Sequence, residues 1–325
     1  MGLNKLMRKI LKKLLIIILI VTVFFTVSFI RHKISLLMEE PLRTPLGKIV
    51  EVDGHNMSVY VEGEGKHTIV FLSGGGTSSP ILDFKSLYTL LVDDYRIVVI
   101  EKFGYGFSDV VDDKRDIATV LRQSRTALEK LDIAGPYILC PHSMSGIEAL
   151  YWAQMYPWEI EAIIGLDMAV PGYYEFMNIN IPMIKLGHYG AVLGITRWIP
   201  GISESEAIKH GNLTDSEKEI YRSIFYYRTA TLTMVNEVKE IKNSAKVVDN
   251  KGVPDVPILL FISNSSGTAG FDEQRWRSIA KEYIAKSDKA EYIELDCPHY
   301  VHDYFYKEIS EYIKDYINTE LDSTE

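Results

Sequence analysis

Residues 141–146 read PHSMSG, and they join a short apolar run, YILC at 137–140, to a helical pattern that begins at Ile147. A serine at a tight turn from a buried strand into a helix presents its hydroxyl above the sheet, and the next backbone N–H points at a developing oxyanion. The positive end of the following helix favours an anion at the same place. Ser143 is therefore a candidate nucleophile on a strand-turn-helix unit.

The order of strands and helices around this turn indicates a mostly parallel sheet. Short apolar runs without alternation, typical of buried parallel strands, occur at 67–73, 97–101, 137–140, 161–166, 257–263 and 291–295. Segments with helical periodicity separate the early runs, and this βαβα order implies a parallel sheet that helices cover on both faces. Two alternating runs around Asp53-Gly54 precede it and predict a hairpin.

The alternation of strands and helices stops between Pro171 and about Pro254, where the sequence becomes helical and rich in Tyr, Met, Ile and Gly. We interpret this segment as a helical cap inserted into one domain after its sixth strand. The predicted units are a basic segment at 1–13, a membrane segment at 14–30, a connector at 31–46, an α/β core at 47–170 and 254–320, and the cap at 171–253.

Length and charge limit the functions that the chain can have. Its 325 residues are 47% hydrophobic, which is enough for one large core. Residues 1–44 hold eight Lys or Arg and two Glu, a net charge of +6, and since the whole chain carries −9, the remainder carries −15. An acidic body argues against nucleic acid or an anionic surface as its partner.

Residues 14–30 contain no charged side chain, and as a helix they would span roughly 25 Å, just enough for a hydrocarbon core. Five Lys or Arg precede them, so the positive-inside rule keeps the N-terminus cytoplasmic and places the globular part outside the cytoplasm. The nearest candidate cleavage site, TVS at 26–28, is poor. We expect an uncleaved single-pass anchor, with a cleaved and secreted form as the alternative.

Cys140 and Cys297 are the two cysteines of the chain. Two cysteines cannot form a disulfide framework, and neither belongs to a metal-ligand spacing. A single bridge is the alternative, but we expect two buried free thiols. No metal or organic cofactor is expected.

Three motifs in order resemble those of the α/β-hydrolase fold superfamily. The stretch PHSMSGIEALYWAQMYP at 141–157 looks like its nucleophile elbow and following helix. The stretch VFLSGGGTSS at 70–79 is similar to its oxyanion loop, and EKFGYGFSD at 101–109 to the turn after the next strand. The resemblance covers roughly 46–320, and it implies a mostly parallel sheet with helices on both faces and a helical cap.

The same resemblance implies a set of site residues. The backbone N–H groups of Gly75 and Met144 match the two oxyanion donors, and His299, just beyond the final strand, matches the catalytic base. The acid usually follows the strand at 257–263, but no carboxylate occurs there before Asp272. Asp167, at a strand end before the cap, resembles the acid of haloalkane dehalogenases. We expect Asp167 to orient His299, with Asp272 as the fallback and a helix N-cap as the other reading of Asp167.

The sequence departs from the family at the flanks of the nucleophile. Pro141 and Ser145 stand where the family has glycine, and Ser73 stands where its oxyanion loop often starts with histidine. Glycine allows close approach and positive φ, so Ser145 is expected to fit with some strain, while Gly146 lets the helix pack closely.

For four other histidines we expect roles outside catalysis. His142 is expected to be a wall residue beside the nucleophile, and His302 to have a packing or supporting role. His32 and His55 are expected at the surface.

We expect a membrane-tethered serine hydrolase that cleaves carboxylic esters through an acyl-enzyme on Ser143. An acyl substrate would bind in an apolar pocket of cap residues, unless these only pack the cap on the core: Tyr173, Tyr174, Phe176, Met177 and Met183. The alternatives are an amidase or aminopeptidase resembling proline iminopeptidases, and a non-catalytic sensor of a small ligand. An acidic cap residue that binds an amine would favour the aminopeptidase, and three are available: Glu175, Glu204 and Glu206. Dehalogenation is disfavoured because those relatives need a carboxylate at the nucleophile.

Overall fold

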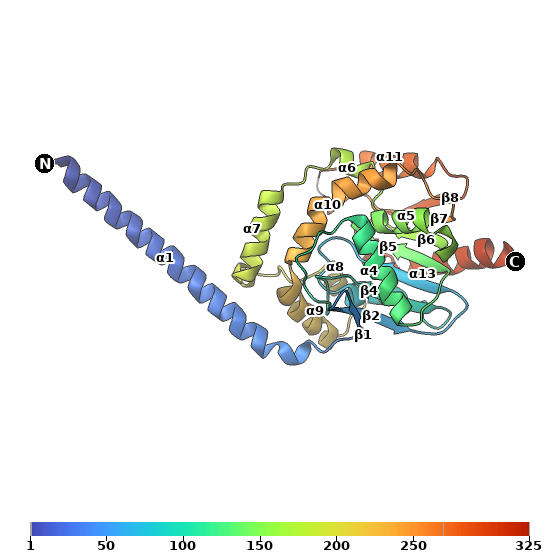
Figure 1. Cartoon of the computed structure of the whole chain (residues 1–325), viewed down its shortest axis with the longest axis horizontal. Coiled ribbons are helices and arrows are strands. Elements are labelled where there is room, and N and C mark those ends of the chain that lie inside the picture. Colours follow the sequence, from blue (N-terminus) through green and yellow to red (C-terminus); the bar gives the residue numbers. More distant parts are fainter. Residues whose placement is uncertain (1, 269, 325) are drawn as a thin grey trace.

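The computed structural model describes residues 2–268 and 270–324, and its centre is an eight-stranded sheet with the order β1-β2-β4-β3-β5-β6-β7-β8 (Figure 1). The strands are β1 (Lys48–Val52), β2 (His55–Glu62), β3 (Thr68–Leu72), β4 (Arg96–Glu101), β5 (Tyr137–Pro141), β6 (Ile160–Leu166), β7 (Ile258–Ile262) and β8 (Ala290–Glu294). β2 pairs antiparallel with both β1 and β4, and all other neighbours are parallel. The predicted hairpin and parallel sheet are confirmed.

Helices cover both faces of the sheet, as the unbroken apolar strands require. Every residue of β3, β5 and β7 is buried. One core contains side chains of α4 (Ile117–Lys130), α5 (Gly146–Met155) and α11 (Glu273–Ile284). The other contains side chains of α2 (Pro80–Asp83), α3 (Lys85–Tyr88), α13 (Tyr306–Tyr316) and the π-helical turn Ile317–Leu321. The site-bearing ends of β5, β6 and β7 are thus held between two packed layers.

The segment between β6 and β7 is helical, so the insertion after the sixth strand is confirmed. Its helices are α6 (Tyr173–Phe176), α7 (Ile181–Val192), η4 (Ile195–Trp198), α8 (Glu206–Lys209), α9 (Asp215–Arg228) and α10 (Leu232–Asp249). Local sequence signals set the starts of the longer ones. Thr214 and Glu217 form a capping box at α9, and the Thr231 hydroxyl accepts a hydrogen bond from Met234 N at α10. The division into core and cap at 171 and 253 stays a prediction.

The N-terminal residues form one helix, α1 (Gly2–Met38), which projects from the domain (Figure 1). Its part from Leu6 to Met38 is long and apolar enough to cross a membrane. Within residues 6–38 the only buried side chains are Ser28 and His32. The expected surface position of His32 is therefore wrong: Arg197 Nε donates to His32 Nδ1 at 3.0 Å, because η4 packs on this part of α1.

A buried ion cluster joins the cap to the core. Lys102 Nζ, just after β4, lies 2.7 Å from Glu237 of α10 and 3.7 Å from Glu148 of α5. The Tyr105 hydroxyl donates to Glu237 at 2.5 Å. Burial raises the pKa of Glu148. Burial is also the largest influence on Glu237 and opposes its ionisation, but the charges of Lys102 and Arg115 and the hydrogen bonds from Lys102 and Tyr105 together outweigh it and lower the pKa of that carboxyl.

Replacing Lys102 by methionine should destabilise the protein by about 3–5 kcal/mol, because the buried carboxylates Glu148 and Glu237 would then lose the ammonium that lies next to both. Urea unfolding of the purified protein measures the change. The double variant Lys102→Met/Glu237→Gln should recover part of the loss, since it removes one of the two unpaired carboxylates. An unchanged midpoint in Lys102→Met would contradict this role of the cluster.

Candidate active site

Ser143 lies on the turn between β5 and α5, in the short helical turn η2 (Ser143–Ser145). Its φ of 52° is in the left-handed region, which is strained for a residue with a side chain. The turn is held because Ala169 N donates to Ser143 O at 2.7 Å. Strain of this kind persists only where surrounding structure enforces it, and here it presents the hydroxyl above the carboxyl ends of the strands.

The residues after Ser143 show how this turn forms with Ser145 at the position where the family usually has glycine. Ser145 has a φ of −70°, so the expected strain at this position is wrong. Its hydroxyl lies 2.5 Å from Leu72 O and 2.8 Å from His142 O, and it ties the elbow to β3. Gly146 does need to be glycine, because a Cβ there would lie 2.3 Å from Ala169 O.

The structure brings Ser143, His299 and Asp167 into one hydrogen-bonded chain. His299 Nε2 lies 2.8 Å from the Ser143 hydroxyl oxygen, and His299 Nδ1 lies 2.5 Å from Asp167 Oδ2. The loop that carries the imidazole is fixed where His299 N donates to Ser266 O at 2.9 Å. The imidazole side chain is 12% exposed and the carboxylate 2%, so the chain runs from the cavity into the core.

Asp167 sits at the end of β6, also at a positive φ, of 47°. Ser263 N donates to its Oδ1 at 2.8 Å and the Ser263 hydroxyl to its Oδ2 at 2.7 Å, while Trp276 Nε1 donates to Oδ1 at 2.9 Å. The reading of Asp167 as a helix N-cap is wrong, because Gly172 occupies that place at α6. The carboxylate is instead held by donors that leave Oδ2 facing His299.

Asp272, the fallback acid, has another role in the structure. It is exposed and is the N-cap of α11, where its carboxylate accepts from Arg275 N at 2.8 Å. The geometry therefore joins His299 to Asp167, and Asp272 stabilises a helix start.

His142 is buried beside His299 and does not point at the nucleophile. Its Nε2 faces His299 O at 3.2 Å, and its ring packs 4.7 Å from the rings of His299, Tyr300 and His302. Burial lowers the pKa of His142 well below its usual range, and the charges of His302 and His299 lower it further. It does not line the cavity above Ser143, so its expected role as a wall residue stays a prediction.

His142 also belongs to a buried group with Asp83 and His302. Each of these residues offers one possible metal-ligand atom, and the atoms lie within 4.8 Å of one another. Hydrogen bonds already engage Asp83, which lies 3.3 Å from His302 Nε2 and accepts from the Tyr221 hydroxyl at 3.0 Å. Three ligands of this type could hold a divalent cation such as zinc only with a fourth ligand or a water. The expected absence of a metal stays a prediction.

The loop after β3 lies against the elbow. A Cβ on Gly74 would come within 2.8 Å of Ser143 Cβ, so this close approach requires glycine. A Cβ on Gly75 would lie 2.9 Å from Met144 Cε, and Gly76 N donates weakly to the Tyr105 hydroxyl at 3.4 Å. Gly75 and Met144 thus line the same space as Ser143, and their role as oxyanion donors stays a proposal.

A cavity of about 670 Å³ opens above Ser143 and His299 between the core and the cap. Four of the five cap residues expected there line it: Tyr173, Tyr174, Met177 and Met183. Phe176 does not line it and is exposed to solvent, so that part of the expectation is wrong. Residues of α10 such as Met234 and Ile241 add to the apolar wall.

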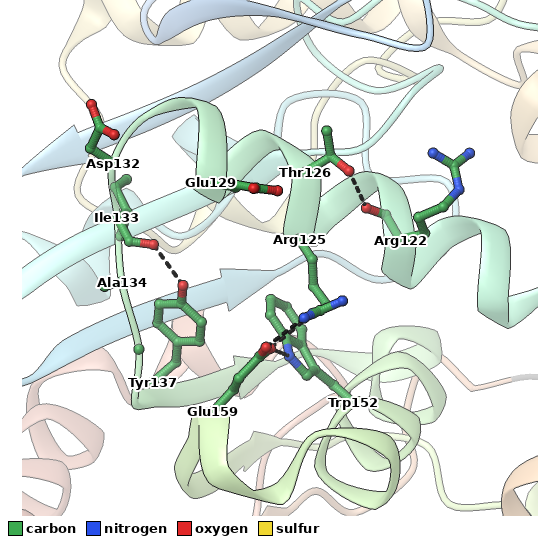
Figure 2. Close-up of a pocket in the computed structure, with 11 residues that line it drawn as sticks. Arg122, Arg125, Thr126, Glu129, Asp132, Ile133, Ala134, Tyr137, Trp152 and Glu159 are labelled. Atoms are coloured by element: carbon green, nitrogen blue, oxygen red, sulfur yellow. Dashed lines mark hydrogen bonds and ion pairs between the residues drawn. The ribbon is translucent and has the colours of Figure 1, made fainter.

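A second hollow, of about 560 Å³, lies between α4 and the turn before β6 (Figure 2). Two of its charged groups pair with each other: Arg125 Nε and Nη2 donate to the Glu159 carboxylate at 2.9 and 2.5 Å, and Trp152 Nε1 donates to it at 2.8 Å. None of the three proposed catalytic side chains lines this hollow. The cavity above Ser143 is therefore the candidate substrate site.

The sequence did not indicate two residues that donate hydrogen bonds to Asp167, namely Ser263 and Trp276. Ser263 ends the apolar run at 257–263, and β7 pairs with β6, so the carboxyl ends of these strands meet at one edge of the sheet. That adjacency could have indicated Ser263. Trp276 comes from α11, whose position over the site no local signal reveals.

Comparisons with known proteins agree with this fold. The chain is 40% identical over 237 residues to the uncharacterized protein YbdG of Bacillus subtilis. This alignment covers 71% of this chain and 73% of YbdG. The haloalkane dehalogenase DbeA from Bradyrhizobium elkani aligns over 86% of this chain and 99% of its own, with a TM-score of 0.66 and 15% identity. The enol-lactonase from Burkholderia xenovorans aligns over 83% and 100%, with a TM-score of 0.61 and 16% identity. No protein-family model matches the sequence.

The strand order, the serine on a strand-to-helix turn and the inserted cap define an α/β-hydrolase fold. The expected resemblance is confirmed: the chain has the α/β-hydrolase fold that these solved structures share, and it belongs to the family that includes YbdG.

Proposed function

We propose that the chain is a serine hydrolase that cleaves carboxylic esters through an acyl-enzyme on Ser143. The observation that carries the proposal is the continuous hydrogen-bonded chain from the Ser143 hydroxyl through His299 to Asp167. Nucleophile, base and orienting carboxylate in this arrangement are recognised by geometry and role, independently of their order in a sequence.

In the acylation step, the Ser143 oxygen bonds to the substrate acyl carbon while His299 Nε2 takes the hydroxyl proton. The carbonyl oxygen becomes an oxyanion, and the backbone N–H groups of Gly75 and Met144 would stabilise it. Asp167 Oδ2 accepts a hydrogen bond from His299 Nδ1–H and stabilises the imidazolium. The bond to the alcohol oxygen then breaks, and His299 returns the proton to the departing alkoxide.

Water resolves the acyl-enzyme by the same groups in reverse. His299 Nε2 takes a proton from the water as its oxygen attacks the acyl carbon, and the proton then passes to the Ser143 oxygen as the bond to the acyl group breaks. The products are an alcohol, a carboxylic acid and the free enzyme.

The lining of the cavity supports an ester with an apolar acyl part. Aromatic, Met and Ile side chains surround Ser143, and apolar walls with few polar groups suit an acyl chain. An enol-lactonase shares the fold, and a lactone is a cyclic ester. DbeA also shares the fold, but haloalkane dehalogenases need a carboxylate where this chain has Ser143.

The three acidic residues that would favour an aminopeptidase do not line this cavity. Arg222 binds Glu204 at 2.7 Å, and Lys209 and the Tyr304 hydroxyl bind Glu206 at 3.0 and 2.7 Å. Glu175 lines another hollow, beside Lys242 and Lys246. A substrate amine would thus find no carboxylate of the expected set near Ser143.

We also propose that α1 tethers the protein to a membrane, with the basic residues 1–13 cytoplasmic and the catalytic domain outside the cytoplasm. The length and apolar character of Leu6–Met38 support the tether, and the cluster of Lys and Arg before residue 14 supports the orientation.

The substrate class is tested with the full chain in detergent or nanodiscs, against p-nitrophenyl esters and aminoacyl-naphthylamides. We expect turnover of the esters and a kcat/KM at least about 100-fold lower for the amides, because none of the described residues that line the cavity is acidic. Faster amide turnover would favour the peptidase alternative. A protein inactive on both classes would favour the ligand sensor.

A further inference from the structure

Helix α7 of the cap presents an apolar face to the outside. Its large exposed side chains are Met183 (61%), Leu186 (64%), Tyr189 (59%) and Val192, and the single charge among the exposed residues of this helix is Lys185. Because a step of three residues falls short of a full turn by about 60°, these side chains form a stripe that winds about halfway round the helix. A helix on the surface of a soluble domain normally turns a polar face outward, so this face is unusual for contact with water.

The segment that directly follows α7 contacts α1 and so holds the C-terminal end of α7 near it. The Ser28 hydroxyl donates to Leu193 O, at the C-terminal end of α7, at 2.8 Å, and Trp198 Nε1 donates to the Ser28 oxygen at 3.0 Å. Gly194 approaches α1 so closely that a Cβ there would lie 2.4 Å from His32 Cβ. Figure 1 shows α7 on the side of the domain that faces α1.

These contacts place the end of α7 at the level of the charge-free segment 14–30, since Ser28 lies within it. The groups next along α1 are those that prefer a membrane-water boundary. The Arg31 guanidinium lies over the Trp198 ring at 4.6 Å, and Arg197 forms a two-point ion pair with Glu39 at 2.7 Å for each bond. Trp and Arg at this position are typical of the interface between hydrocarbon and water.

The same helix borders the candidate substrate cavity. Met183 and Ile184 line the cavity together with Ser143, and Met177 and Ile179 continue the wall from the segment before α7. The outward side of α7 also continues into exposed Trp198 and Ile199. An apolar molecule next to α7 would therefore reach the nucleophile along a wall of mainly apolar side chains, to which Asn178 and Asn180 also contribute.

We propose that the exposed face of α7 lies in the leaflet on the side of the membrane where the catalytic domain lies. The cavity would then open toward the bilayer and take a membrane-dissolved ester as substrate. This inference rests on the proposed ester hydrolysis for its substrate, but not for the placement of α7. Burying this face removes its apolar side chains from water, and Lys185 has a stem long enough to keep its ammonium at the headgroups.

The placement is tested without any activity by an environment-sensitive NBD label on Leu186→Cys in the full chain, in nanodiscs. Cys140 and Cys297 are buried, so the label reacts with the introduced thiol. The matched control is Trp158→Cys, because Trp158 is 72% exposed in the turn before β6, at the opposite end of the parallel strands from the site. We expect blue-shifted emission and quenching by doxyl lipids at 186 alone. Water-like emission at both positions would overturn the placement.

The delivery of substrate is tested with Leu186→Glu/Tyr189→Glu, two residues that do not line the cavity, and with Trp158→Glu as control. Turnover of a soluble short-chain ester should stay within about twofold, as for surface changes elsewhere. Turnover of a long-chain ester dissolved in the nanodisc should fall about tenfold or more, because carboxylates are unfavourable in the leaflet. Equal turnover of the dissolved ester would overturn the delivery route. Inactivity of all proteins on both esters, with the NBD result intact, would instead reject the proposed function.

Discussion

Replacing Ser143 with alanine is expected to lower kcat for an ester by about 10⁶-fold, the loss that removal of the nucleophile causes in serine hydrolases. The reason is geometric, since the Ser143 hydroxyl is the group that His299 Nε2 meets at 2.8 Å. Stability should not fall, because alanine removes none of the bonds that anchor the elbow, which come from the backbone of residue 143 and from the Ser145 hydroxyl. Steady-state assays with a p-nitrophenyl ester and thermal unfolding measure the two effects.

A matched serine separates loss of the nucleophile from a general effect of the substitution. Ser278→Ala removes a hydroxyl that donates to a carbonyl of its own helix, α11, away from the cavity. Its turnover should equal that of the wild type. Residual turnover in Ser143→Ala within tenfold of the wild type would show that another group attacks the ester.

Replacing Asp167 with asparagine is expected to lower kcat by about 10⁴-fold. The single oxygen of the amide cannot accept both the hydrogen bond from His299 Nδ1–H and the other hydrogen bonds that the two carboxylate oxygens now accept. Ser263 and Trp276 already donate to Asp167, so the amide nitrogen would have to face a donor whichever way it turns. His299 would then adopt the wrong tautomer or orientation. The assay is the same as for Ser143→Ala.

Asp272→Asn is the control for this prediction. Asparagine caps a helix about as well as aspartate, so α11 should keep its start and turnover should change little. Retained activity in Asp167→Asn together with a severe loss in Asp272→Asn would reverse the assignment of the acid.

Local patterns in the sequence were enough to predict the sheet, the elbow and the cap. Unbroken apolar runs mark strands that are buried on both faces. A serine between such a run and a helix indicates a nucleophile elbow. The helical spacing of Ile81, Phe84, Leu87 and Leu91 gives less detail, because residues 80–88 form two short helices, α2 and α3, with Phe84 between them. Spacing reports the buried side of a segment and does not report a break in its hydrogen bonds.

The local conformation at the elbow could not be predicted from residue types. The family pattern placed the strain at Ser145, whereas the structure has the positive φ at Ser143 and an ordinary helical φ at Ser145. Asp167 had two readings because its partners Ser263 and Trp276 are distant in the chain. The burial of His32 likewise depends on η4 packing against α1, a contact between segments more than 160 residues apart.

The most direct test of the central claim is labelling of the folded, full-length protein with a fluorophosphonate, followed by mass spectrometry of the modified peptide. Phosphonylation requires an activated serine, so it reports the nucleophile and its base without assuming a natural substrate. We predict stoichiometric modification of Ser143, no modification in Ser143→Ala, and labelling at least about 100-fold slower in His299→Ala. Folded wild-type protein that stays unlabelled, or that is labelled on another serine, would contradict the account.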